Sequence, residues 1–178
     1  MIKSFWQKTI ESGFSLLEIV VTLSLLAVSL VAIITVAVKM LQVEHITEND
    51  FIAKGLLIEA VELAEAKRNA NVAASSPFYL GLATSTTNGS TSSFAIDYTG
   101  ATTTVGALPD ANAQLKYNDT YFYQAATGTA SKFYRRIVST YRTANKGSLE
   151  IEAQVYWADR GGKGNTQKLS TVLYNNVY

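Results

Sequence analysis

The sequence contains no cysteine and a single histidine, His45, among its 178 residues. Without cysteine there can be no disulfide bonds or thiolate metal sites, so a folded domain must be stabilised by burial of apolar side chains alone. One imidazole does not provide a metal centre built from several histidines. We therefore do not expect an enzyme, and we assign no catalytic residue, no metal site and no cofactor.

Charge of one sign is not in excess either, because 15 Lys and Arg residues stand against 14 Asp and Glu residues. This balance does not favour a nucleic-acid groove or an acidic partner. One stretch interleaves aromatic and basic side chains of the kind that contact single-stranded DNA: Tyr121, Tyr123, Tyr134, Arg135, Arg136, Tyr141 and Arg142. Without a net positive charge behind it, we do not expect a nucleic-acid partner.

Two further patterns are too weak to define a ligand site. The segment 161–164 reads Gly-Gly-Lys-Gly, but it lacks the spacing of a phosphate-binding loop and the hydroxyl residue after the lysine. Asp97, Asp110 and Asp119 are expected in loops and lack the spacing of calcium ligands. Neither pattern changes the expectation of a protein without cofactors.

The sequence does contain one long apolar run, since residues 19–38 include no charged side chain. Twenty helical residues rise about 30 Å, which is enough to cross the hydrocarbon core of a bilayer. Lys3 and Lys8 precede the run, which predicts a single-pass anchor with the N-terminus in the cytoplasm and the C-terminal part outside. The run is longer than that of a secretory signal, and no A-x-A-like cleavage site follows it before Lys39.

A carboxylate, Glu18, stands where this apolar run begins. An ionised group near a bilayer core costs about 2.5–3.5 kcal/mol on insertion scales. A carboxylate kept there usually has a partner, and the neighbouring sequence offers none. The stretch Gly13-Phe14-Ser15-Leu16-Leu17-Glu18 resembles the class III signal of type IV prepilins and type II secretion pseudopilins. In that signal a short leader ends in Gly, and Phe, three residues, Glu and an apolar run follow.

The resemblance implies a leader peptide at residues 1–13 and a transmembrane and polymerisation helix at residues 14–40. A prepilin peptidase would cut between Gly13 and Phe14 and methylate the new amine of Phe14. Phe14 and Glu18 would then form the assembly contact, with the amine of one subunit meeting Glu18 of a neighbour. A buried ion pair adds little net stability, yet loss of one partner costs about 3–5 kcal/mol, so Glu18 would set the axial register.

The helix is expected to continue through residues 41–74 as an amphipathic half, because this segment has no proline. Its predicted sheet-facing stripe consists of Phe51, Leu57, Ile58, Val61 and Ala64. Its predicted solvent face consists of Glu59, Glu62, Glu65, Lys67 and Arg68. Gly55 costs about 1 kcal/mol relative to alanine in a helix and could mark a bend.

Residues 75–178 are expected to form a β-rich globular head with a Ser/Thr-rich, partly mobile loop at residues 83–104, which holds one strand-like island at residues 94–98. Alternating side chains predict a strand over residues 149–157, followed after a turn-rich loop at 159–165 by a hairpin partner that contains Leu169 and Leu173.

Two more strands are expected, at residues 133–141 and 121–124, and the first has Phe133, Arg135, Ile137 and Ser139 on one face. We expect Arg135 and Arg136 on a solvated face balanced by Glu150 or Glu152, with a partner-binding patch as the alternative. About three to five antiparallel strands against the helix make an α+β fold, in which a long N-terminal helix packs on a small sheet.

The segment 133–174 resembles the heads of minor pilins of the pilin-modification group. The two resemblances together imply a minor pilin, a structural subunit of a type IV pilus. Its partners would be other pilin subunits, the prepilin peptidase, the pilus assembly machinery and membrane lipid. It would sit in the inner or cytoplasmic membrane with its head outside, and later in an extracellular pilus. The alternatives are a minor pseudopilin of a type II secretion system and a membrane-anchored adhesive or binding domain that never polymerises.

Overall fold

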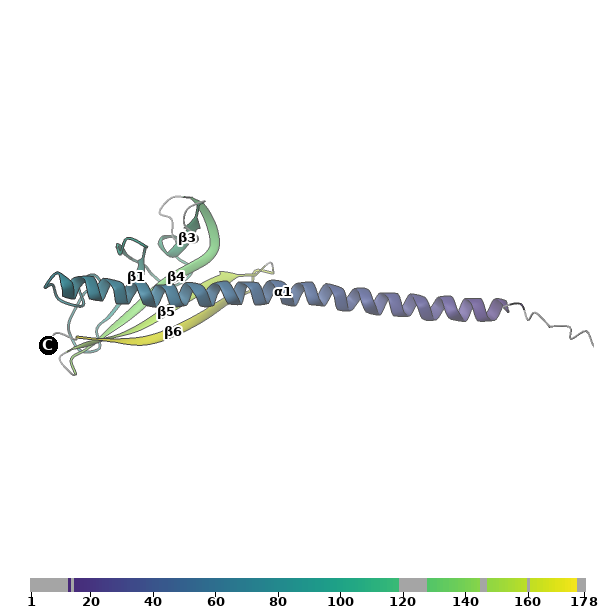
Figure 1. The fold of residues 1–178 in the computed structure, drawn as a ribbon, viewed down its shortest axis with the longest axis horizontal. Coiled ribbons are helices and arrows are strands. Elements are labelled where there is room, and N and C mark those ends of the chain that lie inside the picture. The colour runs from purple at the N-terminus through teal and green to yellow at the C-terminus, as the bar shows by residue number, and fades with distance from the viewer. Residues whose placement is uncertain (1–12, 14, 119–127, 145–146, 160, 176–178) are drawn as a thin grey trace, which may run out of the picture. The chain divides into compact units, whose positions relative to one another are not determined.

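The computed structural model describes residue 13 and residues 15–118, 128–144, 147–159 and 161–175. The chain divides into two compact units, residues 1–47 and residues 48–178. One helix, α1 (Leu16–Ala73), contributes to both units (Figure 1). Each unit is described separately below.

In the first unit α1 begins at the apolar run. The backbone amides of Glu18 and Ile19 donate to the carbonyl of Ser15, at 2.9 Å and 3.2 Å, so Ser15 is the residue that caps the helix. From Leu16 to Thr47 every residue of α1 is exposed. Among the described residues this is the one helix that is long and apolar enough to cross a membrane, judged by length and composition.

The second half of α1 ends in a defined cap. Ser75 takes a left-handed backbone conformation with φ of 56°. The amide of Ser76 donates to the carbonyl of Asn71 at 2.9 Å, and the amide of Ser75 donates to that of Val72 at 3.0 Å. These two bonds satisfy carbonyls that the helix would otherwise leave free, and Pro77 follows, as is common after this type of cap.

Within the described part of residues 48–178, six strands form one antiparallel sheet (Figure 1). The elements after α1 are β1 (Thr91–Ile96), β2 (Thr102–Thr104), a 3-10 turn η1 (Ala111–Ala113), β3 (Gln114–Tyr117), β4 (Thr129–Arg142), β5 (Ser148–Ala158) and β6 (Gly164–Tyr174). The strand order is β2-β1-β4-β5-β6, and β3 pairs with β4. The predicted α+β fold class is confirmed: the long N-terminal helix packs on a small antiparallel sheet.

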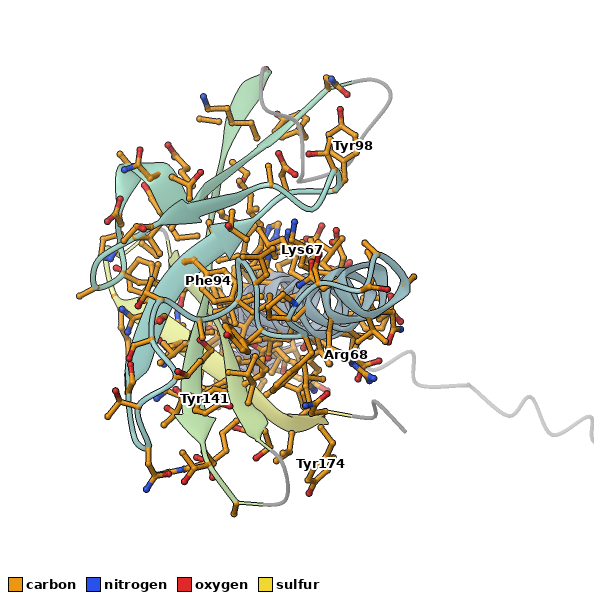
Figure 2. The ribbon with its side chains drawn as sticks, turned by 90° about the vertical axis from the view of Figure 1, so that its left-hand side faces the viewer. Lys67, Arg68, Phe94, Tyr98, Tyr141 and Tyr174 are labelled. Atoms are coloured by element: carbon orange, nitrogen blue, oxygen red, sulfur yellow. The ribbon has the colours of Figure 1, made fainter. Side chains whose placement is uncertain are left out.

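The core of the head lies between the sheet and one face of α1. The helix contributes Ala53, Leu56, Leu57, Ala60 and Ala64, and the sheet contributes residues such as Phe94, Ile137 and Ile151. Figure 2 shows Phe94 and Tyr141 among the side chains between the strands and the helix. The small alanines let the helix approach the sheet closely, so the larger side chains of β1, β4 and β5 fill the space.

The predicted helical stripe is partly wrong. Leu57 and Ala64 are buried as expected, but Phe51 is 79% exposed and Ile58 is 53% exposed. Phe51 precedes the buried Ala60 by nine residues, which is two and a half turns at about 100° per residue, so its side chain points away from the sheet. Both residues are apolar, and apolar character alone did not indicate the side on which they lie.

The Ser/Thr-rich segment is more ordered than the sequence suggests. It holds two strands, β1 and β2, instead of the single island predicted at residues 94–98. Strand β1 ends at Ile96 because the Asp97 carboxylate turns the chain: its Oδ1 accepts hydrogen bonds from the amides of Thr99 and Ala101, at 2.9 Å and 3.0 Å. The sheet has six strands where about three to five were expected; the strand predicted at residues 121–124 lies outside the described residues.

The two long strand predictions are confirmed. β5 buries Leu149, Ile151, Ala153, Val155 and Trp157. It pairs with β6 without interruption from Ser148 opposite Tyr174 to Ala158 opposite Gly164, which confirms the hairpin. β4 buries Phe133, Arg135, Ile137 and Ser139 on its helix side.

Candidate assembly surface

Glu18 lies in the first turn of α1 and is exposed. It stands three residues after the capping residue Ser15, which is the spacing of a capping box, in which the two side chains bond to each other's backbone amides. Neither of these hydrogen bonds is formed. Among the described residues the Glu18 carboxylate accepts no hydrogen bond and forms no ion pair. A capping role therefore does not account for this carboxylate.

The other polar side chains of the apolar run are satisfied within the helix. Four hydroxyl groups donate to carbonyls of the preceding turn: Thr22 to Ile19 at 2.9 Å, Ser24 to Val21 at 2.7 Å, Ser29 to Leu25 at 2.8 Å and Thr35 to Val31 at 2.8 Å. Such bonds remove the cost of placing a hydroxyl in lipid, where no water can replace a missing partner. Within the described part of the segment from Leu16 to residue 38, Glu18 alone remains unpaired.

Large apolar side chains surround this carboxylate on every side of the helix. They include Leu16 at 80%, Leu17 at 73% and Val20 at 56% exposed, and the exposure continues to Ile46 at 53%. An exposed apolar surface of this length is typical of helices that lipid or other apolar helices cover. If lipid or apolar helices cover this surface, they surround Glu18 as well. Its carboxylate would then need a cationic partner, because an unpaired charge is costly in apolar surroundings.

Gly13 is exposed, and apart from its chain neighbours no described atom lies within 4 Å of the place where a side chain would begin. Phe14 lies outside the described residues. The predicted cleavage between Gly13 and Phe14, the methylation of Phe14 and its pairing with Glu18 therefore stay predictions.

The expected solvated face for Arg135 is wrong. Its side chain is 2% exposed and points from β4 to α1, where Nη1 lies 3.2 Å from Oε2 of Glu59. Its Nη2 donates to the carbonyl of Ile96 at 3.1 Å. Glu59, expected on the solvent face of the helix, is three-quarters buried for the same reason. The pair is internal to the head, so Arg135 does not belong to a partner-binding patch.

Burial dominates the electrostatics of this pair. It raises the pKa of Glu59, against the opposing effect of the Arg135 charge and hydrogen bond. Burial likewise lowers the pKa of Arg135, again against the effect of Glu59. Oε1 of Glu59 is buried and makes no hydrogen bond. The ion pair thus holds helix and sheet in one arrangement more than it adds net stability.

Arg136 points to the other side of the sheet, where its partners differ from those expected. Its Nε donates to Oε1 of Gln154 at 2.8 Å and its Nη1 donates to the carbonyl of Gly106 at 2.7 Å. Neither carboxylate expected to balance it forms an ion pair with it, because Glu150 pairs with Arg142 at 2.8 Å and Glu152 with Lys168 at 3.0 Å. The charge of Arg136 nevertheless contributes to lowering the pKa of Glu152, after the hydrogen bonds from Gln154 and Lys168.

The stripe of aromatic and basic residues is divided by the sheet. Arg135 and Tyr141 are buried on the helix side, whereas Tyr134, Arg136 and Arg142 lie on the other face. Tyr121 and Tyr123 lie outside the described residues. A continuous platform for stacking bases is therefore not formed by the described members of the stripe.

The carboxylates of the described loop aspartates Asp97 and Asp110 accept hydrogen bonds from backbone amides. Asp110 accepts from the amides of Gly106 at 2.7 Å and Asn112 at 2.9 Å, and these bonds lower its pKa. The described residues contain no group of three or more metal-ligating side chains. Residues 161–163 of the Gly-Gly-Lys-Gly segment belong to the turn between β5 and β6, where the amide of Gly162 donates to the carbonyl of Asp159 at 2.8 Å, and Gly164 begins β6.

A cleft of about 290 Å³ lies beside β1, β2, η1 and β3, and its lining includes Ile96, Asp97, Asn112, Lys116 and Arg135. Its most buried charge, Arg135, is already bound to Glu59 and Ile96. Asp97 is likewise occupied by its turn. The cleft therefore offers no free convergent set of polar groups, and the exposed apolar half of α1 with Glu18 is the stronger candidate site.

Comparison with protein-family models, with curated proteins and with solved structures gives no match.

Proposed function

We propose that this protein is a structural subunit of a type IV pilus, anchored in the membrane before assembly and packed into the filament through the N-terminal half of α1. The proposal rests on one observation: among the described residues of the exposed apolar run 16–38, Glu18 is the one carboxylate, and it has no partner there. The apolar surface is suited to contact with lipid or with neighbouring helices. A pilus subunit needs both, because it is surrounded by lipid before assembly and by the helices of other subunits in the filament.

The carboxylate supports a filament more than a simple anchor. An anchor that stays in lipid gains nothing from an acidic side chain within its apolar end, since the charge is costly there. In a bundle of helices the same charge has a use, because a cationic amine one turn away or on a neighbouring subunit can pair with it. The resemblance of the 13–18 stretch to prepilin signals names that amine as the one of Phe14.

The experiment replaces Glu18 with alanine in the full chain, co-expressed with its own pilus machinery. We expect membrane insertion to persist because the helix becomes more apolar, and we expect the variant to be missing from sheared filaments, since the partner amine would lose its counter-charge at a cost of about 3–5 kcal/mol. Glu18→Asp keeps the charge with a shorter reach and should give an intermediate yield.

Glu44→Ala is the matched control, because Glu44 is another exposed glutamate of α1 and lies beyond the apolar run. It should enter filaments at the level of the native chain. Wild-type incorporation of Glu18→Ala would overturn the register role of Glu18. A chain that is membrane-bound but never found in filaments would instead support a non-polymerising anchor.

A further inference from the structure

Strand β6 ends the strand order β2-β1-β4-β5-β6, so among the described residues it has a neighbouring strand, β5, on one side only (Figure 1). The pairing with β5 runs from Gly164 to Tyr174 without a register shift. An edge strand presents a row of backbone amides and carbonyls to its open side, and such a row is a template for another strand. The open side of β6 is thus regular over its whole length, and we name it the β6 edge.

Two hydrogen bonds just beyond the ends of β6 show which backbone groups point to the open side. The amide of Asn175 donates to the carbonyl of Gly147 at 3.3 Å, and the amide of Asp159 donates to that of Lys163 at 3.0 Å. Hydrogen-bonded and non-hydrogen-bonded positions alternate in an antiparallel pair, so the odd-numbered residues of β6 bond to β5. The residues that direct their amides and carbonyls away from β5 are the even-numbered ones, among them Thr166, Lys168, Ser170, Val172 and Tyr174.

These outward backbone groups have no partner within the described part of the chain. All five residues are exposed, and no hydrogen bond among the described residues uses their backbone amides or carbonyls. Successive outward residues lie about 7 Å apart along a strand, and each offers one donor and one acceptor to the same side. A polypeptide in extended conformation repeats complementary groups at this spacing, so an extended peptide segment is the class of ligand that the β6 edge fits.

β6 lacks the features that usually protect an edge strand from pairing. It contains no proline and no bulge. Its one charged side chain, Lys168, is held over β5, where Nζ lies 3.0 Å from Oε1 of Glu152. The opposite margin of the sheet is different, because β2 has three residues and the pairing of β3 with β4 shifts register between Gln114 and Lys116. Short and irregular edges resist pairing, so the described sheet is protected at one margin and open at the other.

The side chains of the β6 edge define the segment that fits it. The outer face of the sheet carries Lys168 and Val172, which is 41% exposed, and the helix side carries Leu169, which is 38% exposed. Neighbours across two strands stabilise the pair when apolar side chains meet and when charges are opposite. A matching antiparallel segment therefore has a carboxylate opposite Lys168. It has one apolar residue immediately before the carboxylate, opposite Leu169, and another four residues before it, opposite Val172.

We propose that the β6 edge binds an extended segment of another protein by strand addition, with a carboxylate of that segment beside Lys168. A second copy of this chain fits less well, because β6 has no acidic residue to place beside Lys168 of its mate, and β2 is too short to cover the edge. Antiparallel addition continues the pattern of the sheet and gives the more stable ladder. The contact uses residues 164–174 and is therefore independent of the role proposed for Glu18.

The test measures binding of a synthetic peptide to the full chain in detergent micelles. The peptide, acetyl-Thr-Gln-Val-Thr-Thr-Ile-Glu-Gln-Thr-amide, places Glu opposite Lys168, Ile opposite Leu169 and Val opposite Val172. Amide exchange measured by NMR is the readout. The amides of Lys168, Ser170 and Val172 should exchange fast without the peptide and more slowly with it. The amides of Leu169 and Thr171 should change little, because they already bond to β5.

The matched control is the same peptide methylated on backbone nitrogens. Methylating the amides of Val and Glu removes donors that face β6, and this should abolish the protection. Methylating the amides of Ile and the first Gln removes donors that face away from β6, and this peptide should bind like the parent. The two control peptides have the same composition, so a difference between them reports strand addition and not hydrophobic adsorption.

Variants of the chain test the same contact from the other side. Ser170→Pro removes one outward amide, and proline is tolerated on an edge strand where the amide faces solvent, so this variant should fold without binding. Ser170→Ala keeps the amide and should bind like the native chain. Lys168→Glu should weaken binding about two- to fivefold, the range for one exposed ion pair, and a peptide with Lys in place of Glu should recover it.

No protection by the parent peptide, or equal protection by the two methylated peptides, would overturn the inference. The same holds for protection that does not alternate along β6. Protection of the outward amides that appears without peptide and rises with the concentration of the chain would also overturn it, because a second copy would then be the occupant. If Ser170→Pro does not fold, the methylated peptides still decide the question on the native chain.

Discussion

Nη1 of Arg135 lies 3.2 Å from Oε2 of Glu59, and this contact joins β4 to α1 inside the head. The guanidinium also donates to the carbonyl of Ile96 on β1. One side chain therefore connects three elements that are far apart in the sequence. Because the pair is mostly buried, its two members depend on each other more than either stabilises the fold by itself.

Replacing Arg135 with alanine should destabilise the head by about 3–5 kcal/mol, because the buried Glu59 carboxylate would lose its counter-charge. Urea unfolding of the full chain in detergent micelles measures this change. Arg142→Ala is the control, since it removes an exposed arginine that also pairs with a glutamate, and little change is expected. A double variant, Arg135→Met with Glu59→Leu, should recover most of the stability; equal loss in both would contradict the ion-pair account.

The raised pKa of Glu59 should make the stability of the head depend on pH. Its pKa is raised in the folded chain by burial, so the folded state holds the proton more tightly than the unfolded state. The stabilising contribution is fully present below the ordinary glutamate pKa and is lost as the pH rises through the folded pKa. Relative to Glu59→Gln, the native chain should therefore lose stability as the pH increases over this range. If the difference in unfolding free energy between the native chain and Glu59→Gln does not vary with pH, the pKa of Glu59 is not raised.

Asp97 should show the opposite dependence. Burial raises its pKa, but the hydrogen bonds from Thr99, Ala101 and Gly100 outweigh this and lower it. The stability that Asp97 contributes is therefore present above the ordinary aspartate pKa and is lost as the pH falls through the folded value. Asp97→Asn should remove this acid-sensitive part of the unfolding free energy, and an unchanged acid dependence in this variant would contradict the account.

Amide exchange should follow the sheet order. Residues 149–157 of β5 lie between β4 and β6 and should exchange slowest. Thr91, Ser92 and Ser93 pair with β4 and should also be protected, although the sequence suggested a mobile loop there. Residues 85–88 precede β1 and should exchange fast. Fast exchange over residues 91–93 would show that β1 does not form in solution.

Processing is tested by intact mass. If a prepilin peptidase acts on the chain, the membrane or filament form lacks residues 1–13 and carries a methyl group on the amine of Phe14. Gly13→Leu, which changes the residue before the cut, should leave the full-length mass. A native chain that still begins at Met1 would contradict the prepilin interpretation.

The sequence by itself determined the features that depend on local periodicity. An uncharged run of twenty residues between 19 and 38 indicates a helix that can span a membrane, because length and hydropathy suffice for that inference. Strict alternation over β5 determined both the strand and its buried face, since neighbouring side chains of a strand point to opposite sides. The hairpin to β6 followed from the turn-rich loop between two such patterns.

Only the tertiary structure shows which charged side chain is buried and which aromatic side chain is exposed, against the expectation from residue type. The alternation of the strand predicted that Arg135 lies on the same buried face as Phe133 and Ile137, whereas its charge suggested exposure to solvent. The structure buries Arg135, because Glu59 of α1 forms an ion pair with it. Phe51 is apolar and exposed, because it lies half a turn around α1 from Ala60, which packs on the sheet. Burial of a charge or exposure of an aromatic ring depends on what packs across from it, and that neighbour is set by the fold rather than by the residues nearby in the chain.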